Sequence, residues 1–405
     1  MKPSSMRALC VALVCVSAPV FAMETQVLPQ STFLFDLSYW RSSIDKQWSG
    51  DRKPIPLIEE MKRYEPGAGL QGILRAAPRA DFDFLIVQAL YGITDRLTAA
   101  VYLPIVMHSQ VTTNLSWTPG DYQSGLGRSY SMDDFWAWAA SLGQPRVPDK
   151  WEGGVKLSDM IVGVRYRLPD FEWMTQNHFR WAASLQVALP TGSNFDPEEA
   201  VSVGTNLWEL HAAGDVEAHL SADKHFFVDE TGNYRLNIGA DFYYAFFRPR
   251  QYFAGHGLKN PLLTNNAPYV GDSYIVDGGD WLAGTVSVDV APWFGPAYAS
   301  IVSGHDEKKA WALPPILMFT LSYTRVQTFQ SDWQSQSPLW DYDREKYWQP
   351  GEKNILRATA TVSLLRLGLP FQIYARYQNG DLIPGRYSRP ANVFSAGIKV
   401  VAKFW

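Results

Sequence analysis

Cysteine is almost absent from this sequence. The 405 residues include two cysteines, Cys10 and Cys15, and none follows them. Residues 1–22 contain the parts of an export signal, in this order: the basic residues Lys2 and Arg7, the apolar stretch Ala8–Pro19 and the small-x-small site Val20-Phe21-Ala22. We expect this signal to be removed, so that residues 23–405 form one folded domain. An exported domain of that size without disulfides must derive its stability from another source.

Positive charge and long apolar runs are also scarce. The formal net charge is -4 and becomes -6 when Lys2 and Arg7 leave with the signal, which argues against a nucleic-acid partner. No segment after residue 22 approaches the roughly 18 apolar residues that a membrane-spanning helix needs. If the domain crosses a membrane, it must do so with strands.

Aromatic residues, by contrast, are abundant. They make up 14% of the chain, with 16 Trp, 20 Tyr and 21 Phe. Aromatic rings are favoured at both membrane–water boundaries of an outer-membrane barrel, because an apolar body and a polar tip each find their medium there. The alternative is a large exported β-sandwich with aromatic platforms for a ligand.

The stretch 207–220 alternates between two kinds of side chain. One set is apolar: Leu210, Ala212, Gly214, Val216, Ala218 and Leu220. The other set is mostly ionisable: Glu209, His211, Ala213, Asp215, Glu217 and His219. A period of two is the repeat of a β-strand, so one face of this strand suits lipid and the other suits water. A soluble antiparallel sheet with one wet face would give the same pattern.

The end of the chain favours the membrane interpretation. From Phe394 to Phe404 apolar residues again alternate with residues such as Lys399 and Lys403, and the chain stops at Trp405. This pattern resembles the closing strand of bacterial outer-membrane barrels, whose terminal aromatic residue is read by the assembly machinery. Here Phe404 occupies the expected phase and Trp405 lies one residue beyond it.

Similar alternation recurs along the chain and predicts an all-β fold. We expect strands near 33–40, 81–91, 97–107, 159–168, 179–189, 207–220, 235–244, 279–290, 314–329, 353–366, 370–379 and 392–405. Short turns at 91–95, 168–177, 221–232 and 366–370 alternate with long connections at about 47–80, 110–154, 248–278 and 330–352. This is the rhythm of a transmembrane antiparallel up-and-down barrel with short periplasmic turns and long extracellular loops. The strand count must be even, and we expect about twelve, or fourteen if 297–303 belongs to an extra hairpin.

An open sheet edge is excluded in hydrocarbon, because each unpaired backbone group costs several kcal/mol there. The first strand must therefore pair with the last. On the inward face this would bring Asp36 near Lys399 or Lys403, as an opposite-charge pair across the closing seam.

Several short runs then resemble a known family. They are Tyr91–Leu97 (YGITDRL), Gly163–Leu168 (GVRYRL) after Asp159, Leu189–Gly192 (LPTG) and Gly204–Leu210. Their order resembles the outer-membrane proteins described as putative transporters of the meta-pathway of phenol degradation. The resemblance is specific over about 90–220, and the long loop 133–151 departs from it. It implies a barrel in the bacterial outer membrane and passage of small, aromatic or apolar molecules, and it carries no catalytic residues over.

We expect one charged cluster at the periplasmic end of the lumen, made by seven side chains of four strands: Arg165, Arg167, Arg180, Asp215, Glu217, His219 and Arg235. Glu209, His211 and Asp241 complete the set of charged residues expected to line the lumen. The cluster is either a salt-bridge network that stiffens the wall or a constriction that selects solutes by size and charge.

The alternatives to a channel are an outer-membrane hydrolase and a closed structural or adhesive barrel. Residues i and i+2 of one strand are about 6.5–7 Å apart, too far for direct acid–base pairing, and His211 and His219 would be about 26 Å apart, too far to share a metal. We therefore expect no enzyme, no metal and no cofactor. The expected partners are membrane lipid, the assembly machinery and a small solute.

The loop 133–151 contains an apolar aromatic set: Phe135, Trp136, Trp138 and Trp151. Exposed, such a set would be a liability, so we expect it to fold into the barrel mouth or to lie at the membrane interface. In the mouth it would act as a lid over an apolar solute.

Overall fold

The computed structural model describes most of the chain. The described residues are 25–57, 60–65, 69–122, 127–141, 146, 149–192, 214–229, 233–253, 273–277, 279–294, 314–329, 332–335 and 350–403. The expected export signal at 1–22 lies outside them.

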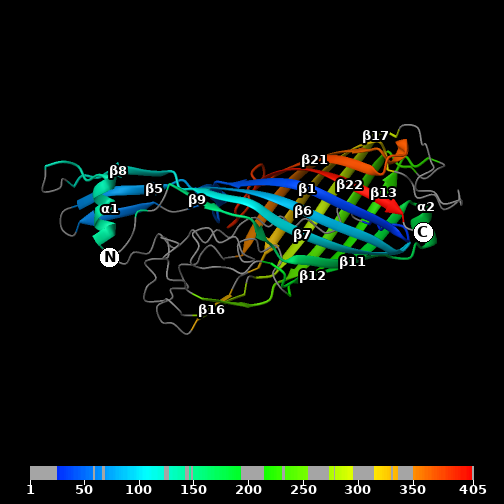
Figure 1. Cartoon of the computed structure of the whole chain (residues 1–405), viewed down its shortest axis with the longest axis horizontal. Coiled ribbons are helices and arrows are strands. Elements are labelled where there is room, and N and C mark those ends of the chain that lie inside the picture. The colour runs from blue at the N-terminus through cyan, green and yellow to red at the C-terminus, as the bar shows by residue number, and fades with distance from the viewer. Residues whose placement is uncertain are drawn as a thin grey trace.

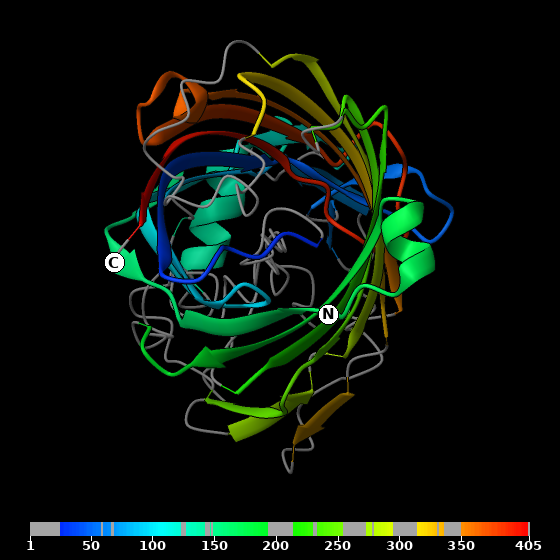
Figure 2. The ribbon, with the colours of Figure 1, turned by 90° about the vertical axis from the view of Figure 1, so that its right-hand side faces the viewer.

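Twelve long strands form one closed antiparallel barrel (Figure 2). They are β1 (Thr32–Ile44), β6 (Arg79–Thr94), β7 (Leu97–Thr112), β11 (Met160–Arg167), β12 (Phe179–Leu189), β13 (Val216–Phe226), β14 (Leu236–Phe246), β17 (Trp281–Trp293), β18 (Leu317–Thr328), β20 (Gly351–Ser363), β21 (Phe371–Asn379) and β22 (Asn392–Lys403). Each pairs with its neighbours in chain order, and β1 pairs with both β6 and β22. The fold class is therefore confirmed, with twelve strands rather than fourteen.

The two ends of the barrel differ, and we name them by their connections. The turn end carries short connections such as the one between β6 and β7, and also α2 (Glu172–Gln176) and the 3₁₀ helix η6 (Leu365–Leu367). The loop end carries the long connections, which contain small sheets of their own (Figure 1).

The first of these sheets joins β4 (Met61–Glu65), β5 (Gly69–Ala76) and β8 (Leu115–Pro119), and α1 (Met132–Ser141) lies beside it. A second joins β15 (Arg250–Phe253), β16 (Ser273–Asp277) and β19 (Asp332–Ser335), and a third joins β2 (Lys46–Trp48) and β3 (Pro54–Pro56). The short strands β9 (Lys150–Gly153) and β10 (Lys156–Leu157) pair with β7. The described part of the chain contains no helix with the length and apolarity needed to cross a membrane.

The outer surface of the barrel is apolar. Exposed hydrophobic side chains occur on one strand after another around the ring: Val101, Val164, Leu185, Leu220, Phe242, Val286, Leu321, Ile373 and Phe394. Leu321 is 57% exposed and Phe242 54%, whereas the inward-facing Glu217 and Asp223 are 2% and 3% exposed. The alternation predicted for these strands is therefore present, with the apolar face outward.

This distribution is the reverse of that in a soluble protein. Burying a Leu or Phe side chain stabilises a fold by about 1.5–3 kcal/mol. Leaving one such side chain on each of the twelve strands in water would forgo about 18–36 kcal/mol, more than the whole net stability of a domain, about 5–15 kcal/mol. Aromatic rings flank the apolar band, with Tyr39, Tyr244 and Tyr377 toward the loop end and Tyr166 and Trp293 toward the turn end. The barrel therefore has the outer surface of a membrane-spanning barrel.

The sixth strand differs from its prediction. We expected it at 207–220 followed by a turn at 221–232, but β13 covers Val216–Phe226. The alternation continues through the buried residues Ser221, Asp223 and His225. The outward Lys224 interrupts the apolar face, with its Nζ 5.2 Å from the ring of Phe226. A lysine near a strand end is compatible with a lipid-facing surface, because its charged head reaches the interface.

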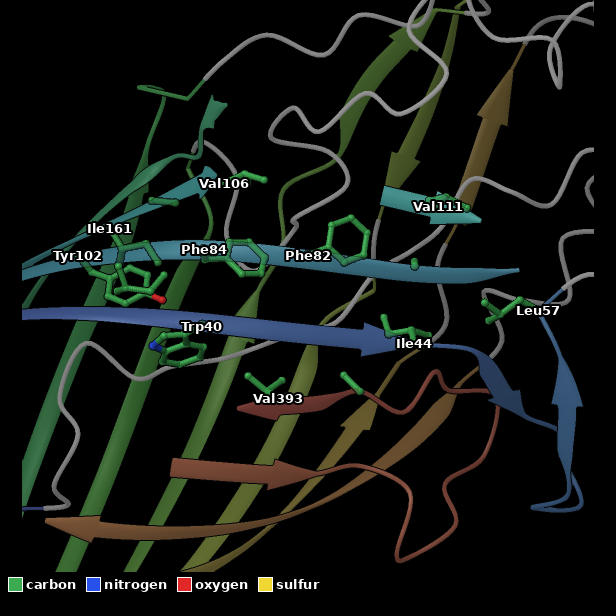
Figure 3. Packing of buried hydrophobic residues seen from close by; sticks show 14 of the residues in the cluster. Trp40, Ile44, Leu57, Phe82, Phe84, Tyr102, Val106, Val111, Ile161 and Val393 are labelled. Atoms are coloured by element: carbon green, nitrogen blue, oxygen red, sulfur yellow. The ribbon is translucent and has the colours of Figure 1, made fainter. Parts of the chain in front are cut away.

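Inside the barrel, the loop-end half of one wall is apolar (Figure 3). Trp40, Phe84, Tyr102 and Ile161, from β1, β6, β7 and β11, belong to one buried hydrophobic cluster. The cluster continues toward the loop end through Leu57 and Val111 to Phe135 and Trp136 of α1. We call the four inward-facing side chains Trp40, Phe84, Tyr102 and Ile161 the apolar wall.

Candidate functional site

The opposite side of the lumen carries carboxylates. We call the inward-facing Glu217, His219, Asp223, Asp241 and Asp289 of β13, β14 and β17 the acidic wall. His219 lies between two of the acids: its Nδ1 is 3.0 Å from Asp241 Oδ2 and its Nε2 is 3.1 Å from Glu217 Oε2. Its ring stacks on Tyr243 with the centroids 4.8 Å apart.

The other two acids of this wall are also hydrogen-bonded. Asp289 accepts hydrogen bonds from Asn237 Nδ2 at 2.9 Å and from Thr320 Oγ1 at 2.6 Å. Asp223 accepts one from Thr25, and His225 Nε2 lies 3.5 Å from its Oδ1. Hydrogen bonds to a buried carboxylate offset part of the cost of removing its charge from water. The acidic wall is thus stabilised by its own neighbours.

The expected single cluster at the turn end is not formed. Because β13 extends to Phe226, Glu217 and His219 lie toward the loop end, opposite Gln186 and Ser184 of β12. Asp223 instead faces Arg180 in the register. Sequence reasoning missed Asp223 and His225 because it ended the strand too early.

The remaining members of the expected cluster are dispersed. Arg165 is buried and its Nε donates to Ser184 Oγ at 2.9 Å. Arg167 lies 3.9 Å from Asp170 near the turn end, and Arg235 is exposed in the turn before β14. Asp215 precedes β13 at the loop end, where it accepts a hydrogen bond from the backbone N of Arg248 at 3.1 Å.

An N-terminal segment, Thr25–Ser31, crosses the inside of the ring at the turn end (Figure 2). It runs from Asp223 of β13 to β7, where the Leu28 backbone N donates to Thr98 Oγ1 at 2.7 Å. A Cβ on Gly92 would lie 2.0 Å from the Pro29 carbonyl oxygen, so this glycine permits the close approach. The N-terminal segment therefore narrows the lumen at the turn end. The alternation of apolar and polar residues, from which the strands were predicted, gives no indication of this segment.

A third group of side chains, on β20, β21 and β22, is cationic. We call the inward-facing Arg357, Arg376 and Lys399 the basic wall. Asp36 stands opposite Lys399 across the closing seam, and Lys399 Nζ lies 3.9 Å from Asp36 Oδ2. Lys403 stands opposite Thr32 at the end of the strand, so the expected seam contact involves Lys399.

Arg357 and Arg376 were not identified from the sequence, although a signal was present. Polar Arg357, Thr359 and Thr361 alternate with apolar Ala358 and Ala360, the pattern that identified β13. The strand had been placed but its faces had not been assigned.

The aromatic loop set lies elsewhere than expected. Phe135, Trp136 and Trp138 are on α1, which packs against the small sheet β4–β5–β8 at the far end of the molecule (Figure 1). The Phe135 ring lies 5.4 Å from that of Trp117 on β8, and Arg63 of β4 lies 3.3 Å from the ring centroid of Trp138. The helix is therefore the apolar side of an outer cap rather than a lid in the barrel mouth. Trp151 is the second residue of β9, where it pairs with Val111 of β7.

Four of the expected site residues lie outside the described residues: Glu209, His211, Phe404 and Trp405. Their proposed roles stay predictions.

The histidine–carboxylate group does not have the geometry of a hydrolytic site. Ser221 Oγ donates to Asp241 Oδ1 at 2.5 Å rather than to His219, and Ser221 is fully buried. A nucleophile must lie within reach of its base and of a substrate. Within the described residues, no group of three or more His, Cys, Asp or Glu side chains is placed to hold a metal ion.

Comparisons with known proteins are distant. No protein-family model matches the sequence, and no curated protein matches it. One similar solved structure is an outer membrane channel from Pseudomonas putida F1, with 11% identity over 94% of this chain and 98% of that chain and a TM-score of 0.49. Another is the Pseudomonas putida toluene transporter TodX, with 10% identity over 96% and 94% and a TM-score of 0.33. A third is the beta domain of the Bordetella autotransporter BrkA, with 11% identity over 92% and 99% and a TM-score of 0.37.

At these TM-scores the likenesses carry no functional argument. The assignment of the fold is based on the closed antiparallel pairing of the twelve strands. The resemblance to the phenol-degradation transporters stays a prediction.

Proposed function

We propose that this chain is a channel of the bacterial outer membrane that passes small molecules through its lumen by diffusion, without a cofactor. One observation carries the proposal. Inward-facing side chains of neighbouring strands, Thr285, Thr320, Arg357, Thr359 and Arg376, are only half-buried although the barrel wall surrounds them. Water therefore reaches them from within the barrel, and a solute of small size would follow the same route.

In this function the turn end faces the periplasm and the loop end faces outward. The N-terminal segment would be the narrowest part of the path, and the charged walls would select solutes. Membrane lipid, the assembly machinery and the solute are the proposed partners. Aromatic or apolar small molecules, as in the phenol-degradation resemblance, are the proposed cargo.

Planar-bilayer recordings of the folded protein test this function. We expect discrete current steps, because each inserted barrel would add one fixed increment of ion current. A folded protein that inserts into the bilayer and yields no steps at any voltage would instead support a closed structural barrel.

A matched pair of cysteine variants tests the route. The chain from residue 23 on contains no cysteine, so a single introduced thiol is the one reactive group. We expect a charged, water-soluble thiol reagent to reduce the current of the inward variant Thr359→Cys. The outward variant Ala358→Cys, one residue away, should be unaffected. Equal effects at both positions would contradict the assignment of the faces.

A further inference from the structure

A groove lies on the outer surface of the barrel, over β17, β18, β20, β21 and β22, with a volume of about 570 Å³. In the register, small outward side chains of β20 and β21 lie between larger ones of β18 and β22. The small residues are Ala358, Ala360 and Ala375, and the larger ones are Phe319, Leu321 and Phe394. The larger side chains are open to the surroundings, since Phe319 is 47% and Phe394 51% exposed. Clefts of about 300–1,000 Å³ hold small ligands, so this groove is large enough for an apolar chain.

Toward the loop end the same outer surface carries arginines. Arg325 of β18 and Arg52 of the turn between β2 and β3 each donate from Nη2 to Glu352 Oε2 at 3.0 Å. Their side chains are 58% and 51% exposed, and a guanidinium has five N–H donors, so both groups can bind a further acceptor. The Nε of Arg386, which is also exposed, donates to the Gly50 carbonyl oxygen at 3.1 Å in the same turn. We call Arg52, Arg325 and Arg386 the outer arginine cluster. Glu352 is the one carboxylate that bonds to this cluster among the described residues, so three positive charges and one negative charge leave +2.

The groove and the outer arginine cluster are parts of one surface. Between them the Tyr323 hydroxyl donates to Asn354 Oδ1 at 2.7 Å, and Asn354 Nδ2 donates to Glu352 Oε1 at 3.1 Å. Leu321 of the groove and Arg325 of the cluster point outward from the same strand, and a rise of about 3.3 Å per residue places them about 13 Å apart. The hydrocarbon of one leaflet is about 15 Å thick, half of a core of about 30 Å. A lipid with its headgroup at Arg325 would therefore have an acyl chain beside Leu321.

The connection between β21 and β22, residues 380–391, adds apolar side chains at the level of the arginines. It is held against β20 by two backbone hydrogen bonds between Glu352 and Arg386, of 2.8 and 2.9 Å. Leu382 of this connection is 69% exposed and Ile383 is 37% exposed. Apolar side chains next to arginines suit the boundary between hydrocarbon and headgroups.

We propose that this surface binds a phosphorylated acyl lipid of the outer leaflet, with its phosphate groups on the outer arginine cluster and an acyl chain in the groove. A guanidinium binds phosphate in a bidentate arrangement, and the net charge of +2 is complementary to a lipid with two phosphate groups. The groove removes apolar surface of the chain from its surroundings and fixes its position. The inference rests on the orientation given with the proposed function, in which the loop end faces outward, and does not require that the lumen conducts.

Native mass spectrometry of the folded protein in detergent, titrated with lipid, tests the arginine cluster. The probes are lipid A, which has two phosphate groups and several acyl chains, the same lipid without its phosphates, and phosphatidylglycerol. We expect lipid A to bind at the lowest concentration, and Arg52→Gln/Arg325→Gln to raise its half-saturating concentration about tenfold or more, because charge-assisted contacts are lost. Arg79→Gln is the matched control and should bind as the native protein. It removes a 52% exposed arginine of β6 that is likewise paired with one carboxylate, Asp81, at 3.0 Å.

A second pair of variants tests the groove. Ala358→Trp fills it, and we expect the half-saturating concentration of lipid A to rise about tenfold, the equivalent of roughly two methylene groups of apolar contact. Ala183→Trp places the same ring on the outer face of β12 and should bind as the native protein. Circular dichroism of each variant checks that the barrel has formed. If the double arginine variant does not fold, Arg325→Lys keeps the charge without the planar fork and should still weaken the binding of lipid A.

Several outcomes would overturn the inference and leave the channel function standing. Equal binding of lipid A and its dephosphorylated form would show that the arginines do not recognise phosphate. Equal binding of lipid A and phosphatidylglycerol would contradict the assignment to a lipid of the outer leaflet. Unchanged binding in Ala358→Trp, or displacement of lipid A by an equal concentration of inorganic phosphate, would show an anion site without a chain in the groove. Absence of current steps in a protein that still binds lipid A would instead refute the proposed function.

Discussion

The acidic and basic walls face the same lumen but keep their charges in different ways. On the acidic wall each carboxylate accepts a hydrogen bond from a side chain, and His219 connects two of them. On the basic wall the two arginines contact an amide and aromatic rings, and they stay half-buried. A charged side chain that is hydrogen-bonded to fixed partners stabilises the barrel wall. A charged side chain without a partner of opposite charge is available to interact with a solute. The difference suggests that stability resides on one side of the lumen and selectivity on the other.

The largest expected effect is on stability, and it is confined to the acidic wall. His219→Ala would leave Glu217 and Asp241 facing each other without the ring between them. We expect the free energy of unfolding to fall by about 3 kcal/mol, since both buried carboxylates lose a partner. Arg376→Gln on the basic wall should lower it by about 1 kcal/mol or less, the size of a lost cation–π contact.

Denaturant unfolding of the two variants in lipid vesicles measures this difference. His219→Gln, which keeps a donor, is the control and should fall between the native protein and His219→Ala. If both walls lose the same stability, the comparison between them is wrong.

The next effect concerns the seam, where Asp36 is the one acid among the described residues that lies close to the basic wall. Asp36→Asn removes the carboxylate that Lys399 contacts, so the positive potential rises. We expect the reversal potential in a potassium chloride gradient to shift toward that of chloride, with a loss of about 1 kcal/mol in unfolding free energy. Asp83→Asn removes the same charge from the outer face, where Asp83 accepts a hydrogen bond from Tyr39, and should leave selectivity unchanged. A shift of equal size in both variants would mean that the seam does not act through the lumen.

The fold was predictable wherever one face of a strand is apolar and the other polar. The sequence assigned the correct faces to Glu217, Ala218, His219 and Leu220. Side chains alternate with a period of two, so only one orientation of the strand places its apolar residues against lipid. The same rule gives no answer for residues 81–91, where Phe82, Phe84 and Ile86 face inward and apolar residues also face outward. Strands with two apolar faces carry no phase in their sequence.

The site was less predictable, because its contacts join segments far apart in the chain. Arg376 meets Trp40 and Thr25 meets Asp223 only after the barrel has closed, and neither contact has a spacing that sequence reasoning could use. The seam pair Asp36 and Lys399 was accessible, since closure itself dictates which strands become neighbours. The sequence does not specify the register in which neighbouring strands pair, and this register determines which side chain lies opposite each charged residue.

The N-terminal segment offers a smaller effect on the same comparison. Thr25→Val keeps the shape of the side chain but removes the hydroxyl that donates to Asp223 on the acidic wall. We expect the segment to be held more weakly, with a cost of about 1 kcal/mol and an open-channel conductance raised by about twofold or less. Thr25→Ser keeps the donor and should conduct as the native protein. Unchanged conductance in Thr25→Val would show that the segment does not set the narrowest point.

The smallest expected effect lies outside the lumen, at the cap formed by α1 and its sheet. There the Arg128 guanidinium, with the backbone and hydroxyl of Ser131, holds the pKa of Asp134 well below its usual range. A carboxyl group whose pKa is lowered by folding stabilises the folded state at pH values above its ordinary pKa. This stabilisation is lost only as the pH falls through the lowered pKa. Asp134 therefore stays ionised from about pH 7 to about pH 5. We expect Asp134→Asn and the native channel to show the same change of reversal potential over this range, recorded in the same salt gradient. Any pH dependence of ion selectivity would then come from groups that titrate on the walls of the lumen. A difference between the two proteins would show that Asp134 in the cap contributes to it.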